Sequence, residues 1–305
     1  MRTVYLGTSG FAATVLELLA LSDHAPVLVV TRPDRPRGRG RRLQSPPVAA
    51  TAHALGLDLG QPADVNADEA RRRIAAARPE AVCICAYGAL IREPLLSEHE
   101  LLNVHPSLLP RWRGAAPVER AIESGDPQTG VSIMRAVAEL DAGPIFLART
   151  EPIRPDDDYG SLSGRLARLS ADLLVETLET APEPEPQSDR GATYAAKIVR
   201  DDRRLDPARS PEELERLVRA LTPHIGAYAE VPGGEQLGVR RAAVWHGGPV
   251  PGPGALEARD QRLILGAEGG AIELLEVQPA GRRPMGAADY PRGSRSAGRQ
   301  DVTRA

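Results

Sequence analysis

The sequence predicts an α/β protein in two parts: a doubly wound, mostly parallel sheet, followed by a small antiparallel β-barrel. In the first half, short apolar strands alternate with helix-like segments, as is typical of a parallel sheet covered by helices on both faces. Around residue 181 the composition changes to "APEPEPQSD", which cannot continue a helix and indicates an exposed linker or loop. Short β-like runs broken by Gly and Pro then follow, and that spacing fits a small barrel.

Three nearly continuous apolar strands define the parallel sheet: "TVYLG" at 3–7, "APVLVV" at 25–30 and "AVCICAYG" at 81–88. Between the first two, "FAATVLELLAL" has the apolar spacing of a helix. The third strand carries Cys83 and Cys85, and two thiols in 305 residues do not make a disulfide framework. We therefore expect both to behave as small buried hydrophobic residues.

Two helices are predicted after the second strand from their end signals. In "SPPVAATAHALG", Ser45 is expected to cap the helix, Pro46 to take its first position and Gly56 to end it. In "NADEARRRIAAARP", Asn66 and Glu69 have capping-box spacing.

The second part opens with a further helix, "SPEELERLVRALTP". Ser210 is expected to cap it, Pro211 to open it and Glu213 to close a capping box. The β-like runs follow at 238–245, 254–258, 262–267 and 271–281, and the tail from about residue 291 has so few apolar residues that we expect disorder. We place a first domain at 1–190, a linker at 191–206 and a second domain at 207–305.

Composition and charge exclude several classes of protein. The net charge is only -3, so no partner is implied by overall electrostatics. The first residues, "MRTVYLGTSG", lack the long apolar stretch of a signal peptide, and no later run could span a bilayer. We expect a soluble, cytoplasmic monomer with no membrane partner.

A Rossmann-like sheet invites a search for a dinucleotide site. The first strand-to-helix turn, "GTSGFA", contains only Gly7 and Gly10. The three-glycine fingerprint is absent, so we expect these glycines to make the turn and not to hold a nucleotide.

The stretch "LLNVHPSLLPRWRGAAP" places an amide and an imidazole at a strand end. Asn103 and His105 are two residues apart and so share one face of a strand, which Pro106 ends. Ligands of open α/β sheets bind at this carboxyl edge. Asn103 could donate to a developing oxyanion and His105 could move a proton. The alternative, a His and an Asn bonded to backbone groups, is locally the commoner arrangement.

A carboxylate in "ELDAGPI" is a second candidate. Asp141 lies between the β-like runs "GVSIMRAV" and "PIFLART". It could orient His105 and support its charged form. It could equally be an ordinary turn residue, because Asp and Gly are common in turns.

Two long stretches, "LLNVHPSLLPRWRGAAPVERAI" and "GVSIMRAVAELDAGPI", closely resemble the methionyl-tRNA formyltransferase family of folate-dependent formyltransferases. The resemblance continues at 32–48, 86–91, 192–198 and 275–285, so it spans nearly the whole chain. It implies a catalytic domain of the Rossmann-like type and an OB-like tRNA-binding domain after the linker. The family shares an Asn, a His and an Asp, which here correspond to Asn103, His105 and Asp141.

The resemblance also implies the reaction. A formyl group passes from 10-formyltetrahydrofolate, used as a co-substrate, to the amino group of methionyl initiator tRNA, giving N-formylmethionyl-tRNA for translation initiation. Asn103 would bind the formyl oxygen, His105 would stabilise that oxygen or shuttle the proton, and Asp141 would orient His105. No metal is implied, and no Cys/His cluster offers a metal site.

The same resemblance assigns the folate to two loops. The residues expected to bind it are Tyr87, Gly88 and Leu90 in "AYGALI", and Ser107, Leu108, Leu109 and Pro110 in the turn after His105.

The basic segment "RPDRPRGRGRR" is the candidate contact for tRNA. Gly38 and Gly40 make it pliable, and no apolar face could fix it to the core, which suits a loop ordered by a polyanion. It could instead be only a solvated surface loop. The resemblance places this loop against the acceptor stem of tRNA, and the residues expected to bind are Arg35, Arg37, Arg39, Arg41 and Arg42.

Two other functions are compatible with parts of the sequence. A sugar-nucleotide N-formyltransferase would use the same three residues on another amine, but the basic loop and the second domain argue against it. A non-catalytic RNA-binding protein would need only the scaffold, and the intact Asn, His and Asp set argues against that.

Overall fold

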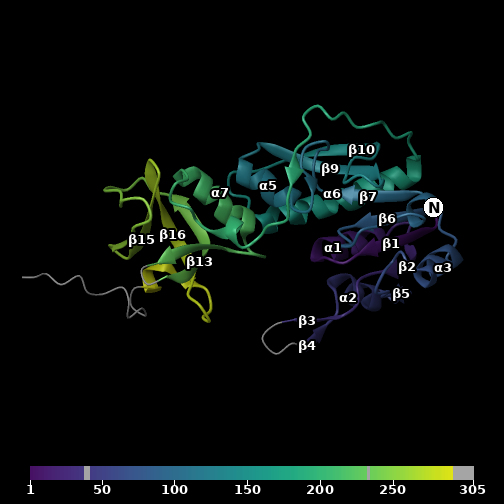
Figure 1. The fold of residues 1–305 in the computed structure, drawn as a ribbon, viewed down its shortest axis with the longest axis horizontal. Coiled ribbons are helices and arrows are strands. Elements are labelled where there is room, and N and C mark those ends of the chain that lie inside the picture. The colour runs from purple at the N-terminus through teal and green to yellow at the C-terminus, as the bar shows by residue number, and fades with distance from the viewer. Residues whose placement is uncertain (38–41, 232–233, 291–305) are drawn as a thin grey trace, which may run out of the picture. The chain divides into compact units, whose positions relative to one another are not determined.

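The computed structural model describes residues 1–37, 42–231 and 234–290, without the side chains of Arg37 and Arg42 (Figure 1). The chain forms two compact units. Unit 1 comprises Met1–Pro117, Gln128–Pro152 and Ser163–Ala196, and unit 2 comprises Val118–Pro127, Ile153–Leu162 and Lys197–Ala305. None of the helices in the described ranges combines the length and the apolar character needed to cross a bilayer.

A mostly parallel sheet forms the centre of unit 1, as the sequence predicts. Its strand order is β10-β9-β7-β6-β1-β2-β5, and the five strands from β7 to β5 run parallel. Strand β9 pairs antiparallel with β7, and β10 pairs antiparallel with β9. The strands are β1 (Thr3–Gly7), β2 (Pro26–Val30), β5 (Leu59–Gly60), β6 (Ala81–Cys85), β7 (Leu101–His105), β9 (Gln128–Arg135) and β10 (Ile145–Pro152).

Short elements and helices complete this part of the chain. Two small strand pairs are β3 (Arg35–Arg37) with β4 (Arg42–Gln44), and β8 (Arg113–Gly114) with β11 (Tyr194–Ala195). The helices are α1 (Gly10–Leu19), α2 (Pro47–Ala54), α3 (Asp68–Ala76), α4 (Leu95–Glu98), α5 (Pro117–Ser124) and α6 (Tyr159–Thr180). The boundary between the units falls inside α5 and inside α6, and α6 was not among the elements predicted from sequence.

Burial explains why the strands were readable from sequence. Every residue of β1 and β6 is buried, so both can be apolar throughout. Cys83 and Cys85 lie in β6 as free, buried thiols, as expected. Desolvation raises the pKa of each to about 12.

Two of the predicted helix caps are wrong. The Ser45 hydroxyl donates to Asp34 at 3.0 Å instead of capping α2, whose N-cap is Pro46. Asn66 and Glu69 form no capping box, because α3 begins at Asp68 with Ala67 as its N-cap. The Asn66 side chain instead bonds to the backbone N–H of Arg92 at 2.8 Å. At both positions the side chain predicted to cap the helix forms a hydrogen bond with a residue outside that helix instead.

The C-terminal part is built on a curled antiparallel sheet packed against one helix. Helix α7 (Pro211–Leu221) has the predicted Ser210 and Glu213 capping box, and its Leu214, Leu217 and Leu221 lie in the core of this unit. The sheet has the path β12-β13-β16-β15-β14, with β17 paired to β16. Its elements are β12 (Ala227–Val231), β13 (Glu235–Val244), β14 (Leu256–Arg259), β15 (Arg262–Ala267), β16 (Gly270–Gln278) and β17 (Met285–Gly286), with 3₁₀ turns at Asp201–Arg203 and Ala287–Asp289.

Candidate active site

Strand β7 presents Asn103 and His105 at its carboxyl end. The strand lies between β6, which is parallel to it, and β9, which is antiparallel, so its backbone is held on both sides. Val104, between the two, is buried, whereas Asn103 is half-buried. The alternation of side chains along a strand puts the amide and the imidazole on one face.

Asp141 meets both residues in the structure. Its Oδ1 accepts a hydrogen bond from Asn103 Nδ2 at 3.3 Å, and its Oδ2 lies 3.6 Å from His105 Nδ1. The backbone N–H of Gly114 donates to Oδ2 at 2.8 Å. Two separate segments of unit 1, β7 and β8, thus converge on the carboxylate of a third.

The other edge of the His105 ring faces the backbone. Nε2 lies 2.8 Å from the carbonyl oxygen of Trp112. A carbonyl only accepts, so Nε2 must donate to it, and the ring orientation is fixed. Nδ1 is therefore the nitrogen on the side of Asp141.

Gly114 has to be glycine for this arrangement. Its φ is +122°, and a Cβ there would lie 2.7 Å from the carbonyl oxygen of Ala195. Arg113 and Gly114 pair in parallel with Tyr194 and Ala195, which places the Gly114 N–H beside Asp141. Sequence reasoning missed the Gly114 N–H and the Trp112 carbonyl, because backbone groups leave no side-chain signal.

Tyr87 and Gly88 follow β6, the direct neighbour of β7. The Thr8 hydroxyl donates to the Tyr87 carbonyl at 2.7 Å, which joins the loops after β1 and β6. The Tyr87 ring is buried, and its hydroxyl makes no hydrogen bond to any described residue. Burial raises the pKa of this phenol. The space where a Gly88 side chain would stand is open for 4 Å, and Leu90 is 66% exposed.

The turn after β7 is tied to β9. The Ser107 hydroxyl is buried and donates to the Arg111 carbonyl at 2.6 Å. Ser132 on β9 donates to the Ser107 carbonyl and accepts from the Leu109 N–H, at 2.8 and 3.2 Å. These bonds use the polar groups of Ser107 internally. Leu108 and Pro110 are half-buried beside them.

Only part of the arginine loop lies in the described residues. Arg35 is exposed at the start of β3, and β3 and β4 project from the central sheet (Figure 1). Asp34, at the start of the loop, accepts from Ser45 after its end at 3.0 Å and from Nε2 of Gln61, which follows β5, at 2.8 Å. Arg39 and Arg41, and the side chains of Arg37 and Arg42, lie outside the description.

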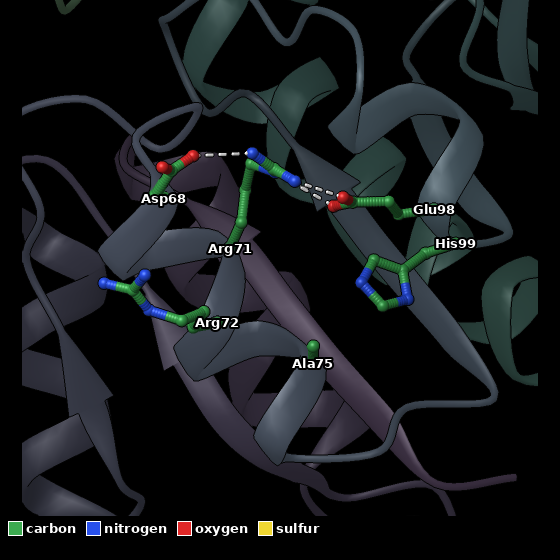
Figure 2. A pocket seen from close by; sticks show the side chains of 6 residues that line it. All are labelled: Asp68, Arg71, Arg72, Ala75, Glu98 and His99. Atoms are coloured by element: carbon green, nitrogen blue, oxygen red, sulfur yellow. Dashed lines mark hydrogen bonds and ion pairs between the residues drawn. The ribbon is translucent and has the colours of Figure 1, made fainter.

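Figure 2 shows a separate groove on unit 1, at the amino end of β7 and so at the edge away from His105. Its volume is about 490 Å³. Arg71 pairs with both Asp68 and Glu98, so its charge is already compensated there. Among the described residues no group of three or more His, Cys, Asp or Glu side chains is placed to hold a metal ion. The lining residues of the groove are Asp68, Arg71, Arg72, Ala75, Glu98 and His99.

Comparisons with known proteins cover both parts of the chain. Residues 1–178 match the family model described as formyl transferase, and residues 197–295 match the model described as formyl transferase, C-terminal domain. A methionyl-tRNA formyltransferase of Halorhodospira halophila is 44% identical over 301 residues, which cover 96% of each chain. One from a Nocardioides species is 43% identical over 302 residues, covering 97% of this chain and 96% of the relative.

A solved structure shares the fold. HypX from Aquifex aeolicus, in complex with tetrahydrofolic acid, superposes with a TM-score of 0.65 at 19% identity. The match covers 96% of this chain but only 48% of HypX, so this chain spans about half the length of that protein.

Proposed function

This chain belongs to the formyl transferase family, and from that premise we propose that it formylates methionyl initiator tRNA. The formyl group comes from 10-formyltetrahydrofolate, and the product is N-formylmethionyl-tRNA for translation initiation. The convergence of Asn103 and His105 on Asp141 is the observation that carries this proposal. Relatives of this name align over nearly the full chain and support the choice of acceptor.

Asn103 and His105 act on the charge that develops at the formyl oxygen. When bound, 10-formyltetrahydrofolate supplies the formyl carbon, which the methionyl amine attacks. The Asn103 amide has two N–H groups, and only one is needed for Asp141, so the second can donate to that oxygen. For His105 to stabilise the same oxygen, or to carry the proton that the amine loses toward the departing folate nitrogen, its Nε2 must exchange the Trp112 carbonyl for the substrate. Asp141 keeps Nδ1 of His105 in place for this step.

The folate fits the loop after β6. Tyr87 follows β6, which pairs with the candidate catalytic strand β7, so this loop lies beside the strand that carries Asn103 and His105. The open space at Gly88 leaves room for a flat ring. Tyr87, Gly88 and Leu90 would hold the pteridine together with Ser107, Leu108, Leu109 and Pro110. A fold relative in complex with tetrahydrofolic acid supports a folate as the ligand.

The tRNA binds through the arginine loop and the second domain. Arg35 is exposed on β3, as a phosphate contact requires. Residues 207–305 form an OB-like tRNA-binding domain on the curled antiparallel sheet, after a catalytic domain at 1–190 and a linker at 191–206. The enzyme works as a cytoplasmic monomer.

One assay tests the function. The full chain is offered 10-formyltetrahydrofolate with charged initiator methionyl-tRNA, uncharged tRNA or an amino-sugar nucleotide, and formyl transfer is measured. Transfer to charged methionyl-tRNA alone is the expected result. Transfer to the amino sugar would reassign the acceptor, and tRNA binding without any transfer would leave only an RNA-binding protein.

A further inference from the structure

The loop that carries Asp141 is held in an unusual backbone conformation. Asp141 has a φ of +48°, in the left-handed region that residues with side chains rarely occupy. Two residues on, a Cβ at Gly143 would lie 1.9 Å from the carbonyl oxygen of Arg135. The residues from 137 to 140 are exposed, so that side of the loop has little packing. Such a conformation persists only where surrounding groups fix it.

Gln187 supplies the fixing contacts. Its Nε2 donates to the carbonyl oxygens of Asp141 and Gly143 at 2.9 and 2.6 Å. The segment that carries Gln187 is itself anchored, because Glu185 and Ile145 exchange two backbone hydrogen bonds of 2.8 Å. The Pro- and Glu-rich stretch at 181–189 thus contacts the candidate catalytic loop. Its composition predicts only an exposed linker or loop.

The same amide also holds the opposite side of Asp141. Gln187 Oε1 accepts from Arg113 Nε and Nη2 at 3.2 and 3.0 Å. Arg113 is only 4% exposed, and its neighbour Gly114 donates its N–H to the Asp141 carboxylate. One side chain therefore joins the backbone of Asp141 to the segment that binds the Asp141 carboxylate.

We propose that Gln187 is a positioning residue for Asp141, and this inference rests on the proposed role of Asp141. Only a neutral amide can donate to two carbonyls with one end and accept from Arg113 with the other. A glutamate would keep the contact with Arg113, and strengthen it, but would set a negative charge against two carbonyl oxygens. The specific function of Gln187 therefore lies in its N–H groups.

The variant Gln187→Glu distinguishes positioning of Asp141 from a role limited to binding Arg113, because it removes the donors to the two carbonyls and keeps an acceptor for Arg113. We expect kcat to fall by about 10- to 100-fold, because a displacement of about 1 Å at a catalytic group can cost ~10²-fold. KM for methionyl-tRNA and the thermal unfolding midpoint should stay close to wild type, because Arg113 keeps its partner. The matched control is Gln128→Glu, an exposed position on β9, which should leave kcat, KM and the unfolding midpoint unchanged. A wild-type kcat in Gln187→Glu would overturn the inference.

A double variant tests whether Gln187 acts through Asp141. If it does, Gln187→Glu combined with Asp141→Asn should lose no more rate than the slower single variant. Multiplicative losses would overturn the inference. A slow Asp141→Asn enzyme beside a normal Gln187→Glu enzyme would reject the inference alone. A normal Asp141→Asn enzyme would reject the proposed role of Asp141 and this inference with it. If Gln187→Glu unfolds, Gln187→Met removes the same donors without adding charge, and a normal kcat in that variant would equally reject the role.

Discussion

The carbonyl of Trp112 and the carboxylate of Asp141 lie against the two nitrogens of His105, at 2.8 Å from Nε2 and 3.6 Å from Nδ1. The ring is 4% exposed, so bulk water does not compete with these contacts. At the scale of single residues, the site is a set of fixed donors and acceptors. The rate of formyl transfer should therefore fall when one of these groups is removed, even if the backbone keeps its conformation.

His105→Ala tests that expectation. Turnover should fall by about 10²- to 10⁴-fold, which is the usual contribution of a positioned acid or base. Affinity for tRNA should hardly change, because the proposed phosphate contacts lie on the arginine loop. Steady-state formylation and a separate tRNA-binding titration measure the two quantities. Near-normal turnover in the folded variant would contradict the role given to His105.

At the scale of elements, the helix caps predicted from sequence were correct where no other group bonds to the capping side chain. Ser210 and Glu213 form both bonds of the capping box at α7, at 3.3 and 2.9 Å. Ser45 and Asn66 have equally good spacing but bond to distant loops. Local spacing identified the potential cap, and tertiary contacts decided its use.

Ser210→Ala should lower the free energy of unfolding by about 1 kcal/mol, the typical cost of losing an N-cap hydroxyl. The loss arises because the backbone N–H of Glu213 loses its acceptor. Urea denaturation of the variant beside Ser124→Ala, an exposed serine, provides the measurement. Equal midpoints for the two variants would show that the cap contributes nothing.

The two buried thiols of strand β6 should make the protein less stable at alkaline pH. Burial raises the pKa of Cys83 and Cys85 to about 12, against roughly 8.5 for an exposed thiol. Between these values the unfolded chain has released protons that the folded chain keeps, so the free energy of unfolding should fall as pH rises from about 9. The stabilising contribution is complete below the unfolded pKa and is lost toward the folded one.

Urea denaturation at about pH 7, 8.5 and 10 measures this slope. The double variant Cys83→Ala with Cys85→Ala should be less stable at every pH, because the smaller side chains leave cavities. Its free energy of unfolding should, however, fall less than that of the wild type between about pH 8.5 and pH 10. Parallel pH profiles for the variant and the wild type would argue against the thiols as the source.

At the scale of the whole molecule, charge is local and not global. The net charge is -3, yet residues 32–42 contain six arginines and one aspartate. Asp34 accepts hydrogen bonds from Ser45 and Gln61, so the described ends of this segment are fixed to unit 1. Such a segment can attract a polyanion that the rest of the surface does not.

Single alanine variants at Arg35, Arg37, Arg39, Arg41 and Arg42, assayed at one fixed salt concentration, test this segment. Arg39 stands between two glycines, which let it reach phosphate or base edges, so Arg39→Ala should cost the most formylation while folate binding stays normal. Each arginine that contacts phosphate should also reduce the salt slope of binding by about 1. Arg72→Ala, exposed on α3, is the control. Equal small losses would leave only diffuse attraction, and no loss would favour a small amino-sugar acceptor.

The sequence by itself determined the parallel sheet and the two side chains at the end of β7. Strands buried on both faces must be apolar, and alternation along a strand puts Asn103 and His105 on one face whatever surrounds it. The long helix α6 was missed because Gly160, Ser161, Ser163 and Gly164 lower the helix propensity of its first turns. Its start does carry a cap, because Asp158 accepts a hydrogen bond from the Ser161 N–H at 2.8 Å.

Tertiary structure alone decided what surrounds those side chains. Asp141 is 38 residues from Asn103 in the chain, and no spacing rule joins a loop to a strand across that distance. The Gly114 N–H, the Trp112 carbonyl and the amide of Gln187 reach the site because strand pairing and loop packing bring them there. Burial repeats with a fixed period along a helix or strand, so it leaves a pattern in the sequence. A site forms once, where segments distant in the chain come into contact, so it leaves no periodic pattern.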